Sequence, residues 1–201
     1  MMGGGEARYE FRVWGDGLDQ LSDRLRSMSA MVEVRESTET YLVSTTTAEV
    51  NPKVRDDLLD IKVLVGVTDG FEQWGVLRKA EFPVDAALLR SDVFAPFGLT
   101  PPTLDREEYT AAQLVDEVVA PHDDLAAVVV SKRREIRSVD TCTGEISAAL
   151  VAGRELQTVA VESTDLAALR ELRRSLGLDG EANVNYPRAL GNLLGGRFGG
   201  H

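Results

Sequence analysis

The chain has 201 residues, enough for one domain with a sizeable core and too few for two ordinary domains. Acidic residues outnumber basic ones 33 to 22, and the resulting net charge of −11 argues against nonspecific binding to nucleic acid or to anionic membranes. The single cysteine, Cys142, excludes an internal disulfide and a multi-cysteine zinc site. No apolar run approaches the roughly 20 residues of a membrane span, and no signal peptide is visible, so we expect a cytoplasmic protein.

Glycine-rich stretches mark both ends of the sequence. They predict flexible segments at residues 1–7 and 195–201. Residues 8–194 contain neither a low-complexity block nor a repeat of fixed period, so we expect a single domain there.

The first half of this domain is rich in strand patterns. Residues 8–14 (RYEFRVW) alternate between apolar and charged side chains, which predicts a strand. Leu18, Leu21 and Leu25 follow at helical spacing and predict a short helix that ends near Met28. Further strands are predicted over residues 31–34 and 39–44, either paired as a hairpin or successive, and over residues 50–55, 59–65 and 73–82.

The second half returns to strands after a mixed, proline-rich stretch. We expect a helix to begin within residues 84–89, another over residues 109–119, and the clearest one over residues 165–176. A turn at Tyr186-Pro187-Arg188 is expected to dock the end of the chain. Strands are predicted over residues 125–136, 144–151 and 156–162. About eight strands without βαβ alternation predict an α+β fold, a mostly antiparallel, closed or nearly closed β-barrel with flanking helices.

Charged residues recur at two-residue spacing on these strands, so the members of each pair share a strand face. Such faces are simply solvated on many antiparallel sheets. If they instead point into one barrel, the cations need anionic partners, because burying unpaired charge is costly. A barrel of about eight strands can hold one small ligand, and a polyanion with several phosphates would satisfy this lining. The residues concerned are Arg8, Glu10 and Arg12, then Lys53 with Arg55, Asp60 with Lys62, Lys79 with Glu81, and Lys132 with Arg134.

These motifs, taken in order, resemble the CYTH superfamily of triphosphate tunnel metalloenzymes, which includes thiamine triphosphatases, inorganic triphosphatases and a class of adenylate cyclases. Arg8-x-Glu10-x-Arg12 stands where that family has Glu-x-Glu-x-Lys, and Ala160-x-Glu162 stands where it has a closing Glu-x-Glu. Arg8 and Ala160 therefore replace two carboxylates that hold divalent ions in the family. The other matching segments are the strand of Tyr41, Lys53-Val54-Arg55, Asp60-Ile61-Lys62, Lys79-Ala80-Glu81 and Lys132-Arg133-Arg134.

The resemblance implies a basic tunnel that binds a triphosphate-containing small molecule and hydrolyses it with a divalent metal. Under this interpretation Glu10 and Glu162 are catalytic, and Mg²⁺ or Mn²⁺ is held by Glu10, Glu81, Glu145 and Glu162. The cations that the resemblance implies for phosphate binding are Arg12, Lys53, Arg55, Lys62, Lys79, Lys132 and Arg134.

Two alternatives stay open beside this interpretation. A catalytically degenerate CYTH-like domain would bind a nucleotide or polyphosphate without turnover, and Arg8 favours this because a guanidinium neutralises phosphate charge without a metal. A protein-interaction domain would use Trp14, Trp74 and Tyr186 as surface anchors, although large aromatic residues in strands are more often part of the core. For the first two interpretations we expect a phosphorylated small molecule as partner, with neither nucleic acid nor a membrane.

Overall fold

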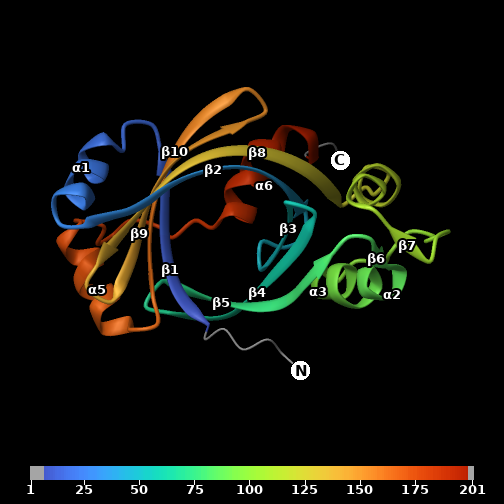
Figure 1. Cartoon of the computed structure of the whole chain (residues 1–201), viewed down its shortest axis with the longest axis horizontal. Helices are drawn as coiled ribbons and strands as arrows, with labels where there is room; N and C mark the ends of the chain where they lie inside the picture. Colours follow the sequence, from blue (N-terminus) through green and yellow to red (C-terminus); the bar gives the residue numbers. More distant parts are fainter. Residues whose placement is uncertain (1–6, 199–201) are drawn as a thin grey trace.

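Eight antiparallel strands close into one barrel in the computed structural model, which describes residues 7–198 (Figure 1). The first strand closes the barrel because it pairs with a strand on each side. This confirms the predicted α+β fold with a closed barrel. In spatial order the strands are β1 (Arg8–Gly15), β10 (Arg154–Ser163), β9 (Cys142–Val151), β8 (Leu125–Val139), β2 (Ala30–Ser44), β3 (Val50–Arg55), β4 (Leu58–Thr68) and β5 (Phe71–Glu81).

The long strand β2 replaces the two short strands predicted over residues 31–34 and 39–44, so that prediction was wrong. It pairs with β8 from Ala30 to Ser44, with one register shift between Met31 and Glu33. The intervening residues 35–38 are polar and lack an apolar alternation, but their backbone groups pair with β8 throughout. Pairing with an equally long partner strand therefore overrides the local pattern.

Two helices cover the outer face of β1, β9 and β10. These are α1 (Asp19–Ser27) and α5 (Leu166–Ser175), which pack Leu25 and Leu169 against Phe11 and Val159 in one buried cluster. The side chain of Asp165 accepts hydrogen bonds from the first backbone N–H groups of α5 and so fixes where this helix begins. On this side both helices were predicted from leucine spacing, and both are present.

The opposite flank of the barrel is covered by short elements between β5 and β8 (Figure 1). Residues 84–89 and 109–119 were expected as helix, but Val84–Asp85 and Glu108–Tyr109 pair as a small two-stranded sheet, and the helical turns begin only at Ala86 and Ala111. Leu89, Phe94 and Val118 bury against Leu59 and Ile61 on the outer faces of the barrel strands. The elements are β6 (Val84–Asp85), α2 (Ala86–Leu88), η1 (Leu89–Phe94), α3 (Ala95–Phe97), β7 (Glu108–Tyr109), α4 (Ala111–Gln113) and η2 (Leu114–Val119).

The last helix, α6 (Tyr186–Phe198), begins inside the ring of strands, and its later turns reach past β8 in this view (Figure 1). Tyr186, expected in a turn, opens this helix and packs with Leu190 against Tyr41, Val130 and Val151 on inward strand faces. Of the segments predicted to be flexible, residues 1–6 and 199–201 lie outside the described residues, and residues 195–198 belong to α6. Within the described part of the chain, no helix is long and apolar enough to cross a membrane.

Candidate functional site

A charged cavity of about 300 Å³ lies inside the barrel, with the first turn of α6 among its walls. Because strand side chains alternate, the charged faces of β1, β2, β3, β4 and β8 point inward while their apolar faces meet the outer helices. The charged residues that line the cavity are six cations (Arg12, Arg35, Lys53, Lys62, Lys132 and Arg134) and four carboxylates (Glu10, Glu33, Glu145 and Glu162). Cations therefore exceed carboxylates here, in a chain whose net charge is −11.

Most of the cations predicted to bind phosphate come together in this cavity. Five of them line it, namely Arg12, Lys53, Lys62, Lys132 and Arg134. Arg55 joins the same group through a shared carboxylate partner, Glu39. Lys79 is exposed and is not among the lining residues.

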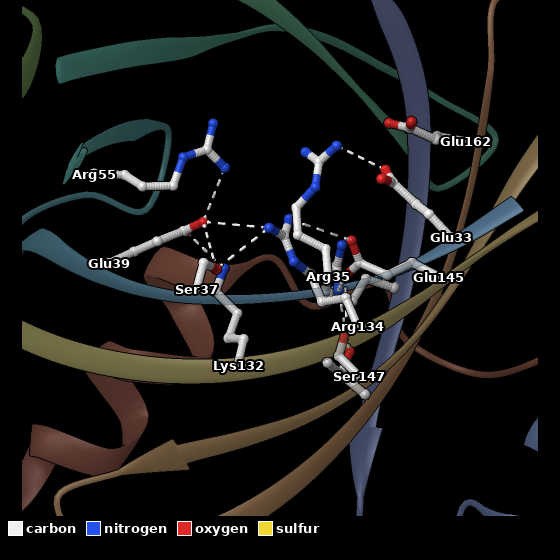
Figure 2. A network of polar contacts seen from close by, with 12 residues as sticks. Glu33, Arg35, Ser37, Glu39, Arg55, Lys132, Arg134, Glu145, Ser147 and Glu162 are labelled. Carbon is white, nitrogen blue, oxygen red and sulfur yellow. Dashed lines mark hydrogen bonds and ion pairs between the residues drawn. The ribbon is translucent and has the colours of Figure 1, made fainter.

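Glu39 on β2 is the centre of the larger ion-pair cluster (Figure 2). Its carboxylate has no exposed surface and lies 2.7 Å from Lys132 Nζ, 3.2 Å from Arg55 Nη1, 3.5 Å from Lys53 Nζ and 3.7 Å from Arg134 Nη2. Burial alone would raise the pKa of Glu39, but Lys53 and Lys132 hold this pKa far below its ordinary value. Glu39 is therefore ionised at neutral pH.

Lys132 is the most buried of these cations, with 2% of its side chain exposed. Burial lowers its pKa to about 8, although the neighbouring Glu39 acts in the opposite direction. Lys132 Nζ also donates a hydrogen bond to Tyr41 Oη at 2.6 Å, and Tyr41 Oη donates to Glu39 at 2.8 Å. These three side chains form a compact buried network in which each polar group has a partner.

Arg12 on β1 and Glu145 on β9 form a second cluster across the intervening strand β10. Arg12 Nη1 donates to Glu145 Oε1 at 3.0 Å, and Arg12 Nε donates to Glu10 Oε1 at 3.0 Å. Ser147 Oγ also donates to Glu145, at 2.9 Å. Burial alone would raise the pKa of Glu145, but Arg12 and Lys132, with the Ser147 hydrogen bond, lower it to about 2.

The remaining lining charges, and Arg8 beside them, are less deeply placed. Arg8 Nη1 lies 3.3 Å from Glu162 Oε1, and Arg35 Nη2 lies 2.7 Å from Glu33 Oε1 (Figure 2 shows the second pair). Burial raises the pKa of Glu162, partly opposed by Arg8. Lys62 has no ion pair with any carboxylate of residues 7–198, which leaves its ammonium free to meet a ligand.

The wall formed by α6 and its neighbours is aromatic. Tyr186 stacks on Tyr41 with ring centroids 5.2 Å apart, and Trp14 packs edge-on against Tyr186 at 4.7 Å. Asn185 Nδ2 donates to both carboxylate oxygens of the buried Glu72, at 3.0 and 3.1 Å. Since Trp74 and Tyr186 are buried in the cavity wall, they are not the surface anchors that a protein-interaction domain would need.

Several polar atoms in the cavity wall lack partners. Within residues 7–198, Arg134 Nε, Tyr186 Oη and Asn51 Oδ1 are buried without a hydrogen bond, and all three residues line the cavity. Burial raises the pKa of Tyr186, so its hydroxyl keeps its proton at neutral pH. Arg134 Nε and Tyr186 Oη are therefore buried donors without acceptors, and such groups need a partner that only a water, an ion or a ligand would supply here.

The carboxylates that the resemblance implies for Mg²⁺ or Mn²⁺ do not fit such an ion. Glu10 and Glu145 share Arg12, and Glu162 pairs with Arg8. Glu81 is exposed and lies outside the cavity lining. Over the chain from residue 7 to residue 198, no three His, Cys, Asp or Glu side chains gather as a metal-binding group. A hard cation needs several carboxylate oxygens free of other partners, and guanidinium groups take them here.

Sequence reasoning missed Arg35 and Asn185, which line this cavity, and the buried Glu39 and Glu72, which bind lining residues from behind the wall. Glu39 had a readable signal, because it lies two residues from Tyr41 and therefore shares its strand face. Arg35 had a weaker one, since it falls in the polar stretch of β2 that was not predicted as strand. Asn185 had none, because its place depends on α6 entering the barrel.

Comparison with known proteins supports the fold. No family model matches the chain, and no curated protein sequence matches it. The structure of the PH1819 protein from Pyrococcus horikoshii OT3 is similar with a TM-score of 0.50 and 14% identity, over 94% of this chain and 99% of that one. At this level of identity, the similarity concerns the fold alone. The closed, eight-stranded antiparallel barrel expected from the sequence is present.

Other solved structures are similar at lower scores. A candidate adenylate cyclase from Bacillus halodurans has a TM-score of 0.49 and 12% identity, over 90% of this chain and 97% of that one. HpAC1 from Hippeastrum, described as a candidate adenylyl cyclase with a dominant triphosphatase activity, has a TM-score of 0.44 and 13% identity. That similarity extends over 86% of this chain and 88% of the other.

Proposed function

We propose that this protein binds a phosphorylated small molecule, with a triphosphate group as the best fit, in the cavity of its CYTH-like barrel and without a divalent metal. The observation behind this proposal is the convergence of six cationic side chains from five strands on one cavity. The sequence resemblance to the CYTH superfamily supports the same ligand class. Each charge-assisted contact with a phosphate oxygen contributes about 1.5–3 kcal/mol, so several cations together suffice for specific binding.

The unused donors of the cavity favour phosphate. Lys62 has no ion pair with a described carboxylate, and Arg134 Nε and Tyr186 Oη have no acceptor within the described residues. A phosphate chain offers several acceptor oxygens spread along its length, whereas one carboxylate offers only two. The proposal therefore assigns the phosphates to the space among Lys62, Arg134 and Tyr186.

Binding without a metal follows from the donor set. Arg8 and Arg12 pair with the carboxylates that would otherwise hold the ion. A guanidinium also neutralises phosphate charge directly and in a bidentate geometry. Arginine thus supplies the positive charge that Mg²⁺ would supply elsewhere.

Calorimetric titration with tripolyphosphate in the presence of EDTA tests this proposal. We expect saturable binding to the wild type, weakened about tenfold or more by Arg134→Gln, because a buried charge-assisted contact is lost. Arg133→Gln is the matched control, since Arg133 is the next residue on β8 and its side chain is 54% exposed. Absence of binding to the wild type, or equal weakening by both substitutions, would contradict the proposal.

A phosphate-release assay separates binding from turnover. With Mg²⁺ or Mn²⁺ added, we expect no release of phosphate from tripolyphosphate or from a nucleoside triphosphate, because the carboxylates are engaged by arginine. Metal-dependent release that disappears in Glu10→Gln would establish the hydrolytic alternative in its place.

Affinity for tripolyphosphate should fall as the pH rises above about 8. The pKa of Lys132 is lowered to about 8 by burial, so its ammonium loses its proton in that range in the unliganded protein. Phosphate binds the protonated form of Lys132. Above this pKa, part of the binding free energy is therefore spent on protonating Lys132. Titrations at pH 7 and pH 9.5 check this, and a Kd that does not change over this interval would exclude Lys132 from binding.

A further inference from the structure

Glu39 occupies the position of an anion within the cation cluster. Its carboxylate lies within 4 Å of four cationic side chains, two from β3 and two from β8. Figure 2 shows Arg55, Lys132 and Arg134 around it. No other carboxylate of the described chain has more than three such partners. The protein therefore places one of its own carboxylates among the cations proposed to receive phosphate.

The surroundings of Glu39 hold it in place. Its backbone lies in the middle of β2 opposite Val130, and its side chain has no exposed surface. Tyr41 Oη donates to it at 2.8 Å and Ser37 Oγ donates at 3.4 Å. A short side chain anchored in this way cannot swing out of the barrel when a ligand enters.

The cluster needs an anion to remain assembled. Lys132 is almost fully buried, and an ammonium in that position without a partner would be costly. Arg55 and Lys53 extend from β3 toward the same carboxylate, across from β8. Glu39 thus keeps cations from two parts of the wall together when no ligand is present.

We infer that Glu39 is a built-in counter-anion that assembles the binding cations and, by its own negative charge, limits the affinity of the cavity for phosphate. This inference rests on the proposed function. A bound phosphate and Glu39 share the same cations and repel each other at short range in a partly desolvated site. The arrangement selects ligands with several phosphates, because a single phosphate gains too few contacts to offset this repulsion.

The substitution Glu39→Gln tests the inference, since it keeps the shape of the side chain and removes its charge. We expect tripolyphosphate to bind about tenfold more tightly than to the wild type, and orthophosphate to become a measurable ligand. The unliganded variant should have a lower Tm because Lys132 loses its partner, and tripolyphosphate should raise this Tm by more than in the wild type. Glu36→Gln is the matched control, because Glu36 is exposed on the same strand and the change in net charge is identical.

The outcomes distinguish the two claims. If the wild type does not bind tripolyphosphate, the proposed function fails. If the wild type binds and Glu39→Gln binds equally or more weakly, only the counter-anion inference is overturned. If Glu39→Gln does not fold, the double variant Glu39→Gln/Lys132→Gln tests the same point. It removes the ammonium that lacks a partner, and we expect it to fold. A double variant that is also unfolded would contradict the role of Glu39 as the counter-charge of Lys132.

Discussion

Replacing Arg12 by methionine is expected to destabilise the protein by about 3 kcal/mol or more, since breaking a buried ion pair leaves the remaining charges without a partner. Only 6% of the Arg12 side chain is exposed, and it binds both Glu10 and Glu145. Burial lowers the pKa of Arg12, but the two carboxylates outweigh this and raise it well above its ordinary value. Methionine keeps the apolar stem, so the loss reports on the charge rather than on packing.

Chemical denaturation measures the free energy of unfolding that Arg12→Met removes. A thermal scan of this variant should show a Tm lower by roughly 6–12 °C in a protein of this size. Arg8→Met is the control, because Arg8 lies on the same strand face but is 44% exposed, with one ion pair to Glu162 and one hydrogen bond to Thr143. We expect it to cost no more than about 1 kcal/mol. Adding Glu145→Gln to Arg12→Met should recover part of the stability, and a purely additive double variant would contradict the coupling.

Acidification should destabilise the wild type between about pH 4.5 and pH 2. The pKa of Glu145 is lowered to about 2 in the folded protein, mainly by Arg12 against the effect of burial. A carboxylate with a depressed pKa adds stability that is fully present above its unfolded pKa and disappears as the pH falls through the folded one. Allowing for its 17% exposure, Glu145 should contribute about 2–3 kcal/mol at neutral pH.

Urea unfolding at pH 7, 4.5 and 3 checks this contribution. Glu39, whose pKa is also depressed by Lys53 and Lys132 against burial, adds to the same acid sensitivity. The comparison with Glu145→Gln isolates one carboxylate, since this variant should be less stable at pH 7 and should lose less stability on acidification. If the free energy of unfolding falls equally in the wild type and in Glu145→Gln between pH 4.5 and pH 3, the pKa of Glu145 is not depressed in the folded protein.

Alternation along the strands was enough to predict the barrel and most of its inward cations. Arg12, Lys53, Lys62 and Arg134 were each assigned to a charged strand face, and each lines the cavity. The period of two residues fixes the face of a strand regardless of its neighbours, which explains why these assignments transfer to the fold.

Position along the barrel axis is not encoded by alternation. Lys79 pairs with Asp60 across β4 and β5, yet it is exposed and does not line the cavity. How far each strand is displaced relative to the next depends on the stagger of the whole barrel and on bulges such as the register shift between Ile61 and Lys62. The depth of a side chain therefore depends on pairings that no single segment reveals.

The charges that complete the cavity depend on long-range packing as well. Glu39 meets Arg55 sixteen residues later and Lys132 more than ninety residues later, so its partners become evident only after the barrel closes. The glycines near α6 suggested a flexible tail rather than a helix, because glycine lowers helix propensity. Burial of Tyr186 and Leu190 against the inner wall overrides that propensity.

The helix inside the barrel has a consequence for how a ligand would travel. Tyr186 and Leu190 of α6 pack tightly on Tyr41, Val43 and Val130, so apolar side chains fill one end of the ring. The cavity is therefore closed at the end where α6 packs against the strands. If the proposed ligand binds in this cavity, it enters and leaves on the side away from α6, near Glu33 and Arg35, whose side chains are 42% and 49% exposed.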